Sequence, residues 1–479
     1  MQTTLIPAGA CAWLASCAVE PPRARPDMLE VDVPAAWSAA AAPADGARAP
    51  SRVDWWREFG DPRLDELVML GLANNPNLRA SLARFEAAAA GRVIAGAPLL
   101  PAFDASFQSD RLQRQFLGFP FGGAGGLPPT TFTQFGLSLG VRWELDVWGR
   151  LRSADAAALA DQQAAVNDLQ GAQLSLAAQV CRAWYAAVEA RQQAELAAAT
   201  VAAFERTLED VRDRYRRGVR PALEVHQAAT NLANAQSNAT QRTDLLQRAL
   251  RQLDTLVGRY PGGDFPLSED LPDVLPGVPA GIPSELLQRR PDLRAAERRV
   301  AAAGCRVEAA NAALYPKLAL SANAGTQSVD IDDILDQDSG AWALGANLLQ
   351  PIFQGGALRA EVDRRRALRK EALARYTDAV LRAFREVEDI LAADALLERR
   401  SRSLEDAVTN AAQARDLARE RWQAGLTDFL AVADGQRQAF QAESARLTLA
   451  RQRIDNRIDL LLALGGGYQN ASDDDANAR

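Results

Sequence analysis

Asn75-Pro-Asn-Leu-Arg-Ala80 reveals how this chain of 479 residues is organised, because it returns as Arg290-Pro-Asp-Leu-Arg-Ala295, 215 positions later. Weaker matches follow in the same order at an offset of 207, among them Tyr215-x-x-Gly218 with Trp422-x-x-Gly425. Internal repetition over this length indicates that one structural unit occurs twice in the chain. The change of offset indicates that the first copy carries the longer loop.

The repeats also set the expected segment boundaries. Outside the repeats we expect a signal peptide over residues 1–16, for which the motif at Cys17 is given below, and an extended Ala- and Pro-rich linker over 17–53. We also expect a Pro-rich linker over 259–280 and a flexible tail over 468–479. The two repeats cover residues 54–258 and 281–467. Each repeat is expected to contain a helix, two strands, a long helix and a second, shorter helix.

Each repeat is expected to begin with one helix, over 64–97 in the first and 284–314 in the second. These helices end before Pro101 and Pro316, because a proline forces the preceding residue out of the helical region. Residues 151–217 contain no proline and predict a continuous helix of roughly 100 Å, at 1.5 Å per residue.

Glycine is expected to end the long helix of each repeat, at Gly218 and Gly425, because it suits the left-handed conformation of a helix cap. A shorter helix then follows in each repeat, over 225–256 and 432–463.

Apolar residues recur at every seventh position of the first long helix, from Leu169 to Val211. A strict spacing of seven predicts a coiled coil, and the many alanines among these positions predict a close partner backbone. In the second repeat the companion positions include Asp394, Ser401 and Arg415, so we expect a more polar seam there.

The stretch Leu137-Ser-Leu-Gly-Val-Arg-Trp-Glu-Leu-Asp-Val147 alternates apolar residues with polar residues or glycine. The same alternation occurs over 103–108, 318–324 and 342–348, which predicts four strands with one apolar and one polar face. Such strands suit a membrane barrel with lipid outside and water inside. A soluble coiled-coil scaffold would explain the heptads but not these strands.

The composition argues against several functional classes. The net charge is −7, which argues against general nucleic-acid binding. The sequence contains one histidine, His226, which we expect on a helix surface. A single histidine argues against metal sites built from several histidines and against most His-based catalysis. Without a nucleophile motif, a phosphate loop or metal-ligand spacing, we expect no enzyme, no metal and no cofactor. No stretch reaches the roughly 18 apolar residues that a membrane-spanning helix needs.

The start of the chain resembles a bacterial lipoprotein. Leu14-Ala-Ser-Cys17 resembles a lipobox, in which the cysteine receives a covalent lipid, although residues 1–22 lack the Lys or Arg of a signal peptide. Cys11 is the alternative attachment site, but it lacks the preceding leucine. Ala18, rather than an aspartate, follows Cys17, which by the bacterial sorting rule indicates the outer membrane.

A tandem repeat with these elements, behind a lipobox, resembles the outer membrane factor family, the TolC-like proteins. The resemblance extends over residues 17–468 and is greatest to the OprM-like lipoprotein branch that serves resistance-nodulation-division (RND) efflux pumps. The motifs that carry it are Asp54-Trp-Trp-x-x-Phe59-x-Asp61-Pro62-x-Leu64, Trp143-Glu-Leu-Asp-Val-Trp-Gly-Arg150, Pro351-Ile-Phe-Gln-Gly-Gly356, Arg214-Tyr215-x-x-Gly218, Arg421-Trp422-x-x-Gly425 and Leu464-Gly-Gly-Gly-Tyr468.

The resemblance implies a mostly α fold with a small β part, assembled as a homotrimer in the outer membrane of a Gram-negative bacterium. Four strands from each of three chains would form one 12-stranded β-barrel, and the helices a periplasmic coiled-coil barrel. The implied function is a passive exit duct for drugs and small molecules. An inner-membrane RND transporter would supply the energy through a periplasmic adaptor. The alternative is the exit duct of a type I protein secretion system.

The resemblance also assigns site residues. The family's periplasmic gate falls on Leu430, Asp434 and Arg437, and Asp428 is the next candidate for the gate carboxylate. The alternative role for Asp434 is purely structural: a carboxylate in the first turn of a helix, where the helix dipole favours negative charge. The two turns on which the adaptor would dock carry Arg214, Tyr215, Gly218, Arg421, Trp422 and Gly425.

Overall fold

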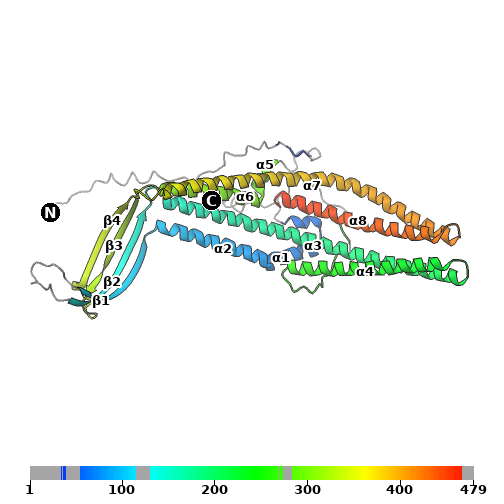
Figure 1. The fold of residues 1–479 in the computed structure, drawn as a ribbon, viewed down its shortest axis with the longest axis horizontal. Helices are drawn as coiled ribbons and strands as arrows, with labels where there is room; N and C mark the ends of the chain where they lie inside the picture. The colour runs from blue at the N-terminus through cyan, green and yellow to red at the C-terminus, as the bar shows by residue number, and fades with distance from the viewer. Residues whose placement is uncertain are drawn as a thin grey trace, which may run out of the picture. The chain divides into compact units, whose positions relative to one another are not determined.

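The computed structural model describes residues 34, 36–38, 54–114, 130–268, 270–272 and 283–466. Cys11 and Cys17, the expected signal peptide over 1–16 and the expected tail over 468–479 lie outside the described residues. The described chain is mostly helical and contains one four-stranded antiparallel sheet, as the sequence predicts (Figure 1). Among the described residues, no helix is both long and apolar enough to cross a membrane.

The two repeats contain the same elements in the same order. The first comprises η1 (Trp55–Phe59), α1 (Pro62–Asn74), α2 (Pro76–Gly96), η2 (Ala97–Leu99), β1 (Ala102–Arg114), β2 (Thr130–Leu145), α3 (Arg150–Arg216) and α4 (Ala222–Leu256). The second comprises α5 (Pro283–Arg289), α6 (Pro291–Ala312), β3 (Lys317–Ser328), η3 (Gln337–Ser339), β4 (Gly340–Leu349), α7 (Ala357–Gln423) and α8 (Phe429–Ala463). The described residues form two compact units, one within 85–165 and 296–376, the other within 34–84, 166–295 and 377–466.

The first helix of each repeat is broken, and the prediction of one continuous helix was wrong in both repeats. The breaks fall between α1 and α2 and between α5 and α6. Asn75 has extended backbone angles, φ −62° and ψ 125°, because Pro76 follows it. Its side-chain oxygen then caps α2 by accepting from the backbone N–H groups of Asn77 at 2.9 Å and Leu78 at 3.1 Å.

The end of the last helix of each repeat contacts these breaks. The Asn75 side-chain amide donates to the Leu256 carbonyl at 2.8 Å, and Arg290 donates to the Ala463 carbonyl at 3.2 Å. Positions 256 and 463 are 207 apart, and 75 and 290 are 215 apart, so the two hydrogen bonds are equivalent. The repeated stretch therefore joins the first and last helices of its own repeat.

Glycine is required beside each of these joints. Gly258 has φ +75°, and a Cβ there would lie 2.7 Å from the Asn74 carbonyl oxygen. Gly465 has φ +88°, and a Cβ there would lie 2.9 Å from the Arg289 carbonyl oxygen. Both glycines therefore combine a left-handed backbone with a backbone contact that leaves no room for a side chain.

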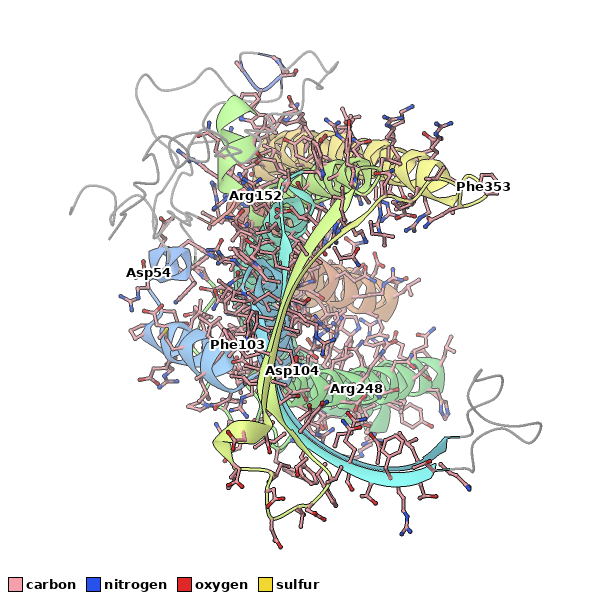
Figure 2. All side chains as sticks on the ribbon, turned by 90° about the vertical axis from the view of Figure 1, so that its left-hand side faces the viewer. Asp54, Phe103, Asp104, Arg152, Arg248 and Phe353 are labelled. Carbon is pink, nitrogen blue, oxygen red and sulfur yellow. The ribbon has the colours of Figure 1, made fainter. Side chains whose placement is uncertain are left out.

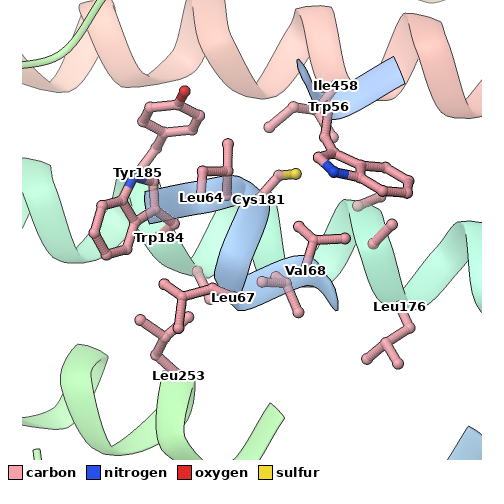
Figure 3. Close-up of a cluster of buried hydrophobic side chains, with 14 of the residues drawn as sticks. Trp56, Leu64, Leu67, Val68, Leu176, Cys181, Trp184, Tyr185, Leu253 and Ile458 are labelled. Atoms are coloured by element: carbon pink, nitrogen blue, oxygen red, sulfur yellow. The ribbon is translucent and has the colours of Figure 1, made fainter. Parts of the chain in front are cut away.

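A large apolar core surrounds the first joint (Figure 3). Its buried side chains come from η1, α1, α2, α3, α4, α8 and the segment between the repeats. They include Trp56, Leu64, Leu67, Val68, Leu176, Cys181, Trp184, Tyr185, Leu253 and Ile458. Asp61 caps α1 and also accepts from Trp184 Nε1 at 2.9 Å and Ser268 Oγ at 2.7 Å. Asp61 thus ties α1 to the long helix α3 and to the segment that joins the repeats.

The two long helices differ as their heptads predict. Heptad residues of α3 such as Leu176, Ala183 and Val211 are buried. In α7, Asp394 lies 3.9 Å from the Arg457 guanidinium of α8, and Ser401 accepts from Arg453 at 3.5 Å. The seam of the second repeat is therefore the more polar one, as expected.

The sheet is a meander in the order β1-β2-β3-β4, and its strands are longer than predicted. Apolar residues pair with apolar residues along its register, for example Phe103 with Val141, and Val141 with Ala322. The opposite face pairs Ser106 with Ser138, whose hydroxyls are 3.0 Å apart. Neighbouring residues Phe103 and Asp104, both labelled in Figure 2, belong to the apolar and the polar face respectively. Strands β1 and β4 each have one edge without a partner strand in the described chain.

We predict that Gly258→Ala and Gly465→Ala each lower the free energy of unfolding by about 2–5 kcal/mol, since each adds a steric clash to backbone strain. Gly60→Ala is the matched control, because Gly60 has φ +68° but no atom within 4 Å of an added Cβ. It should lose only about 1–2 kcal/mol. Denaturant unfolding followed by tryptophan fluorescence measures all three, and equal losses at Gly60 and Gly258 would contradict the close contact.

Candidate functional site at the two helical turns

The long helix of each repeat ends in the same hydrogen-bonded turn. Gly218 has φ +73° and Gly425 has φ +77°. These left-handed angles confirm the prediction that a glycine ends each long helix. Val219 N–H donates to the Arg214 carbonyl at 3.0 Å, and Leu426 N–H to the Arg421 carbonyl at 2.8 Å. These bonds form the Schellman motif, which satisfies the last carbonyl groups of the helix and reverses the chain.

Trp422 is the centre of the packing between the two turns. It is 1% exposed and meets Phe429 edge to face, with ring centroids 6.2 Å apart. The Arg214 guanidinium of the other turn lies over the Trp422 ring, 4.4 Å from its centroid, and donates to the Gln423 carbonyl at 3.3 Å. The structure thus brings Arg214 and Trp422 together, and the indole is not available for direct contact with a partner.

Arg220 is a residue of this site that the sequence analysis missed. It donates to the carbonyl groups of Trp422 at 3.4 Å and Thr427 at 3.5 Å, and pairs with the largely buried Glu224 at 3.5 Å. Arg220 therefore links the first turn to the second. No pattern points to it, because it stands in a turn, outside both heptads.

Apolar side chains are exposed at equivalent positions of the two turns. Val219 and Leu426, which are 207 positions apart, are 65% and 69% exposed. Leu223 and Leu430, also 207 apart, are both 64% exposed. Tyr215 is 48% exposed, whereas its counterpart Trp422 is buried. Both turns therefore present an apolar surface in a single chain.

A groove of about 620 Å³ adjoins these turns, between α3, α4 and α8. The three predicted gate residues Leu430, Asp434 and Arg437 line it together. So do Gln227 and Thr230, which hold the positions of Asp434 and Arg437 in the first repeat. The two sides of the groove are therefore chemically unequal.

Asp434 is held by its own helix. It forms an ion pair with Arg437 and accepts from Gln438 Nε2 at 2.6 Å. Asp434 is the sixth residue of α8, beyond the first turn, so the helix dipole does not account for it. Asp428 has a separate task, because it caps α8 by accepting from the Ala431 N–H at 3.1 Å.

Carboxamides complete the α4 side of the groove. Asn231, Asn234 and Asn238 are spaced at i, i+3 and i+7, which puts them on one helix face, and all three line the groove. The spacing of these asparagines in the sequence is the signal that could have identified them. His226 lies on the exposed surface of α4 at the same groove. In the described part of the chain, no group of three or more His, Cys, Asp or Glu residues is arranged to hold a metal ion.

Comparison with known proteins agrees with this architecture. The outer membrane efflux protein family matches residues 67–259 and 282–466. The chain is 32% identical to the probable efflux pump outer membrane protein SepC of Pseudomonas putida, over 98% of both proteins. It is 34% identical to the pyoverdine export outer membrane protein OpmQ of Pseudomonas aeruginosa, over 96% of both. Its fold resembles the outer-membrane channel OprN, with a TM-score of 0.82 and 29% identity over 91% of this chain and 97% of that one. The chain therefore belongs to the outer membrane efflux protein family.

Proposed function

We propose that the protein is the outer-membrane exit duct of a tripartite efflux pump. In this proposal it conducts small molecules passively, and an inner-membrane RND transporter supplies the energy through a periplasmic adaptor. The observation that carries the proposal is the amphipathic sheet, whose β1 and β4 edges have no partner strand in the described chain. The relatives include a pyoverdine export protein of Pseudomonas aeruginosa, which favours small organic cargo over protein secretion.

The open sheet edges support a homotrimer. Unpaired backbone groups are very costly in lipid, so strands in a membrane must close into a barrel. Four strands are too few to close, whereas pairing β4 of one copy with β1 of the next extends the sheet without leaving an edge. Three copies then give 12 strands, with the face of Phe103 and Leu139 toward lipid and the face of Ser106 and Asn323 toward water.

The groove residues support a gate at the periplasmic end. On a three-fold axis, the copies of Asp434 would face one another and repel in a narrow, poorly hydrated ring. Arg437 offsets this repulsion within each chain, because it pairs with Asp434. The exposed Leu430, one helical turn away, supplies an apolar stopper next to the ring.

We predict that Asp434→Ala combined with Leu430→Ala raises single-channel conductance in planar bilayers, because it removes both the ion-paired ring and the stopper. Asp434→Ala alone should weaken cation preference, since a carboxylate ring attracts cations. Gln227→Ala combined with Leu223→Ala, at the equivalent positions of the first repeat, is the matched control and should conduct like wild type. A double mutant at 430 and 434 with unchanged conductance would place the constriction elsewhere and count against the gate. A protein that forms no channels at all would count against the duct.

The exposed turns support docking of an adaptor. Val219, Leu223, Leu426 and Leu430 leave an apolar patch at the end of each helical pair, and such patches mark sites of protein interaction. Arg421 and Tyr215 are exposed beside them. The buried Trp422 and the half-buried Arg214 over its ring would contribute by holding the turns in shape.

Replacing Gly218 and Gly425 together by valine should abolish drug resistance but leave the amount of protein in the outer membrane unchanged. A β-branched residue at φ above +70° costs about 1–2 kcal/mol and distorts both turns. Gly60→Val is the control, because Gly60 has the same backbone conformation outside the turns. Resistance assays in a strain lacking its own duct measure the effect, and full resistance in the double mutant would argue against docking there.

We also propose that the mature chain is anchored by a lipid on Cys17. The lipobox before Cys17 supports this, and Ala18 supports an outer-membrane destination. Cys17→Ser should abolish incorporation of labelled palmitate in cells, whereas Cys11→Ser should leave it intact. Labelling that survives in Cys17→Ser would overturn the assignment.

A further inference from the structure

A second hollow belongs to the unit formed by residues 85–165 and 296–376. It measures about 570 Å³ and is lined by α3, α6 and α7. Pockets of this size commonly hold small molecules. Nothing in the proposed duct function requires it.

Two matching stripes of side chains line most of this hollow. The stripe on α6 is Ala296, Arg299, Ala303 and Arg306, and the stripe on α7 is Arg365, Leu368, Ala372 and Arg375. Both follow the spacing i, i+3, i+7 and i+10, which keeps their members on one face of the helix. Each stripe contributes two guanidinium groups and two apolar side chains. The hollow therefore combines small apolar surfaces with positive charge.

The lining carboxylates do not balance this charge. They are Asp161, which forms an ion pair with Arg306, and Glu371, which pairs with Arg375 at 2.5 Å. Against four guanidinium groups they leave a net charge of +2 on the lining residues. Arg365 has its carboxylate partner outside the lining, in Glu361 at 2.6 Å.

Glu361 is itself shared between two cations. Arg364 also donates to it at 2.6 Å. Hydrogen bonds from Arg364 and Arg365 lower the pKa of Glu361 to about 2. One carboxylate thus serves two guanidinium groups, so the excess of positive charge extends beyond the lining of the hollow.

We propose that this hollow binds an anionic amphiphile, a molecule with a phosphate or carboxylate head on an apolar body. Guanidinium groups bind such heads through paired, charge-assisted hydrogen bonds. Ala296, Ala303, Ala372 and Leu368 offer the apolar surface that the body of the ligand requires. A membrane phospholipid and an exported anionic solute share this chemistry.

The test uses the full-length protein in amphipol, with octyl phosphate as the probe and native mass spectrometry to count bound molecules per chain. Wild type should bind octyl phosphate in preference to octyl glucoside, which has the same apolar chain without the charge. Arg299→Gln combined with Arg306→Gln should weaken octyl phosphate binding at least about tenfold. Equal binding of the two probes to wild type would overturn the proposal.

Arg306→Gln removes the ion-pair partner of Asp161 and could weaken binding through a folding defect. A second variant that keeps all the ion pairs is therefore needed. Leu368→Glu removes no ion pair and adds one negative charge to the lining, and it should weaken octyl phosphate binding as well. Arg382→Gln combined with Arg385→Gln is the control, because these exposed arginines of α7 pair with Asp378 and Asp389 outside the hollow. Binding that falls equally in this control, or is unchanged in Leu368→Glu, would contradict a specific site.

The same measurement distinguishes the two sources of the ligand. A phospholipid that copurifies with wild type, is absent from the arginine variant and is displaced by octyl phosphate identifies a membrane lipid. Octyl phosphate binding to a protein that carries no lipid identifies a soluble anion. These readouts do not use transport, so a failure here would leave the duct untouched, and a failure of the duct would leave the site.

Discussion

Each repeat depends on one close contact between backbone atoms. In this contact, a carbonyl group at the break in the first helix lies against a glycine that follows the last helix. Asn74 meets Gly258 in the first repeat, and Arg289 meets Gly465 in the second. In both, a side chain beside the break donates to the end of the last helix, and the apolar core forms around the first of these joints. Backbone can approach backbone so closely only without a Cβ, which is why glycine stands at both positions.

Much of this architecture follows from the sequence alone. The offsets of 215 and 207 reveal the duplication, the alternation over 137–147 locates a strand, and Gly218 and Gly425 mark the ends of the long helices. These features can be predicted because each leaves a local pattern in the sequence, namely a regular spacing of residues or a glycine in a left-handed helix cap. The strand ends were less accurate, since pairing with neighbours extends a strand beyond its alternating core.

The predictions that were wrong or incomplete concern features that depend on contacts between distant segments. The helices expected over 64–97 and 284–314 look continuous because their apolar pattern runs through Pro76 and Pro291. The break becomes favourable because Asn75 bonds to Leu256, 181 positions away. Arg220 escaped notice for the same reason, since its partners Trp422 and Thr427 are about 200 positions distant. The burial of Trp422 likewise depends on the other repeat, because Leu208 and Val211 pack in the same cluster and Arg214 lies over the ring.

The duplication also allows the two halves to diverge in chemistry while they keep one fold. Asp434 and Arg437 replace Gln227 and Thr230 across a single groove, and the α7 seam is more polar than that of α3. A charged pair and a polar seam are easier to separate than a packed apolar one, because water can solvate the groups that part. The second repeat is thus better suited than the first to the opening movement that the proposed gate requires.

The proposed duct depends most of all on other copies of the same chain completing the open edges of the four-stranded sheet. The mass of the purified protein in detergent, measured by light scattering with the detergent contribution subtracted, tests this directly. The account predicts a particle of three chains that persists on dilution. A stable particle of one chain would contradict it, because β1 and β4 would then remain unpaired.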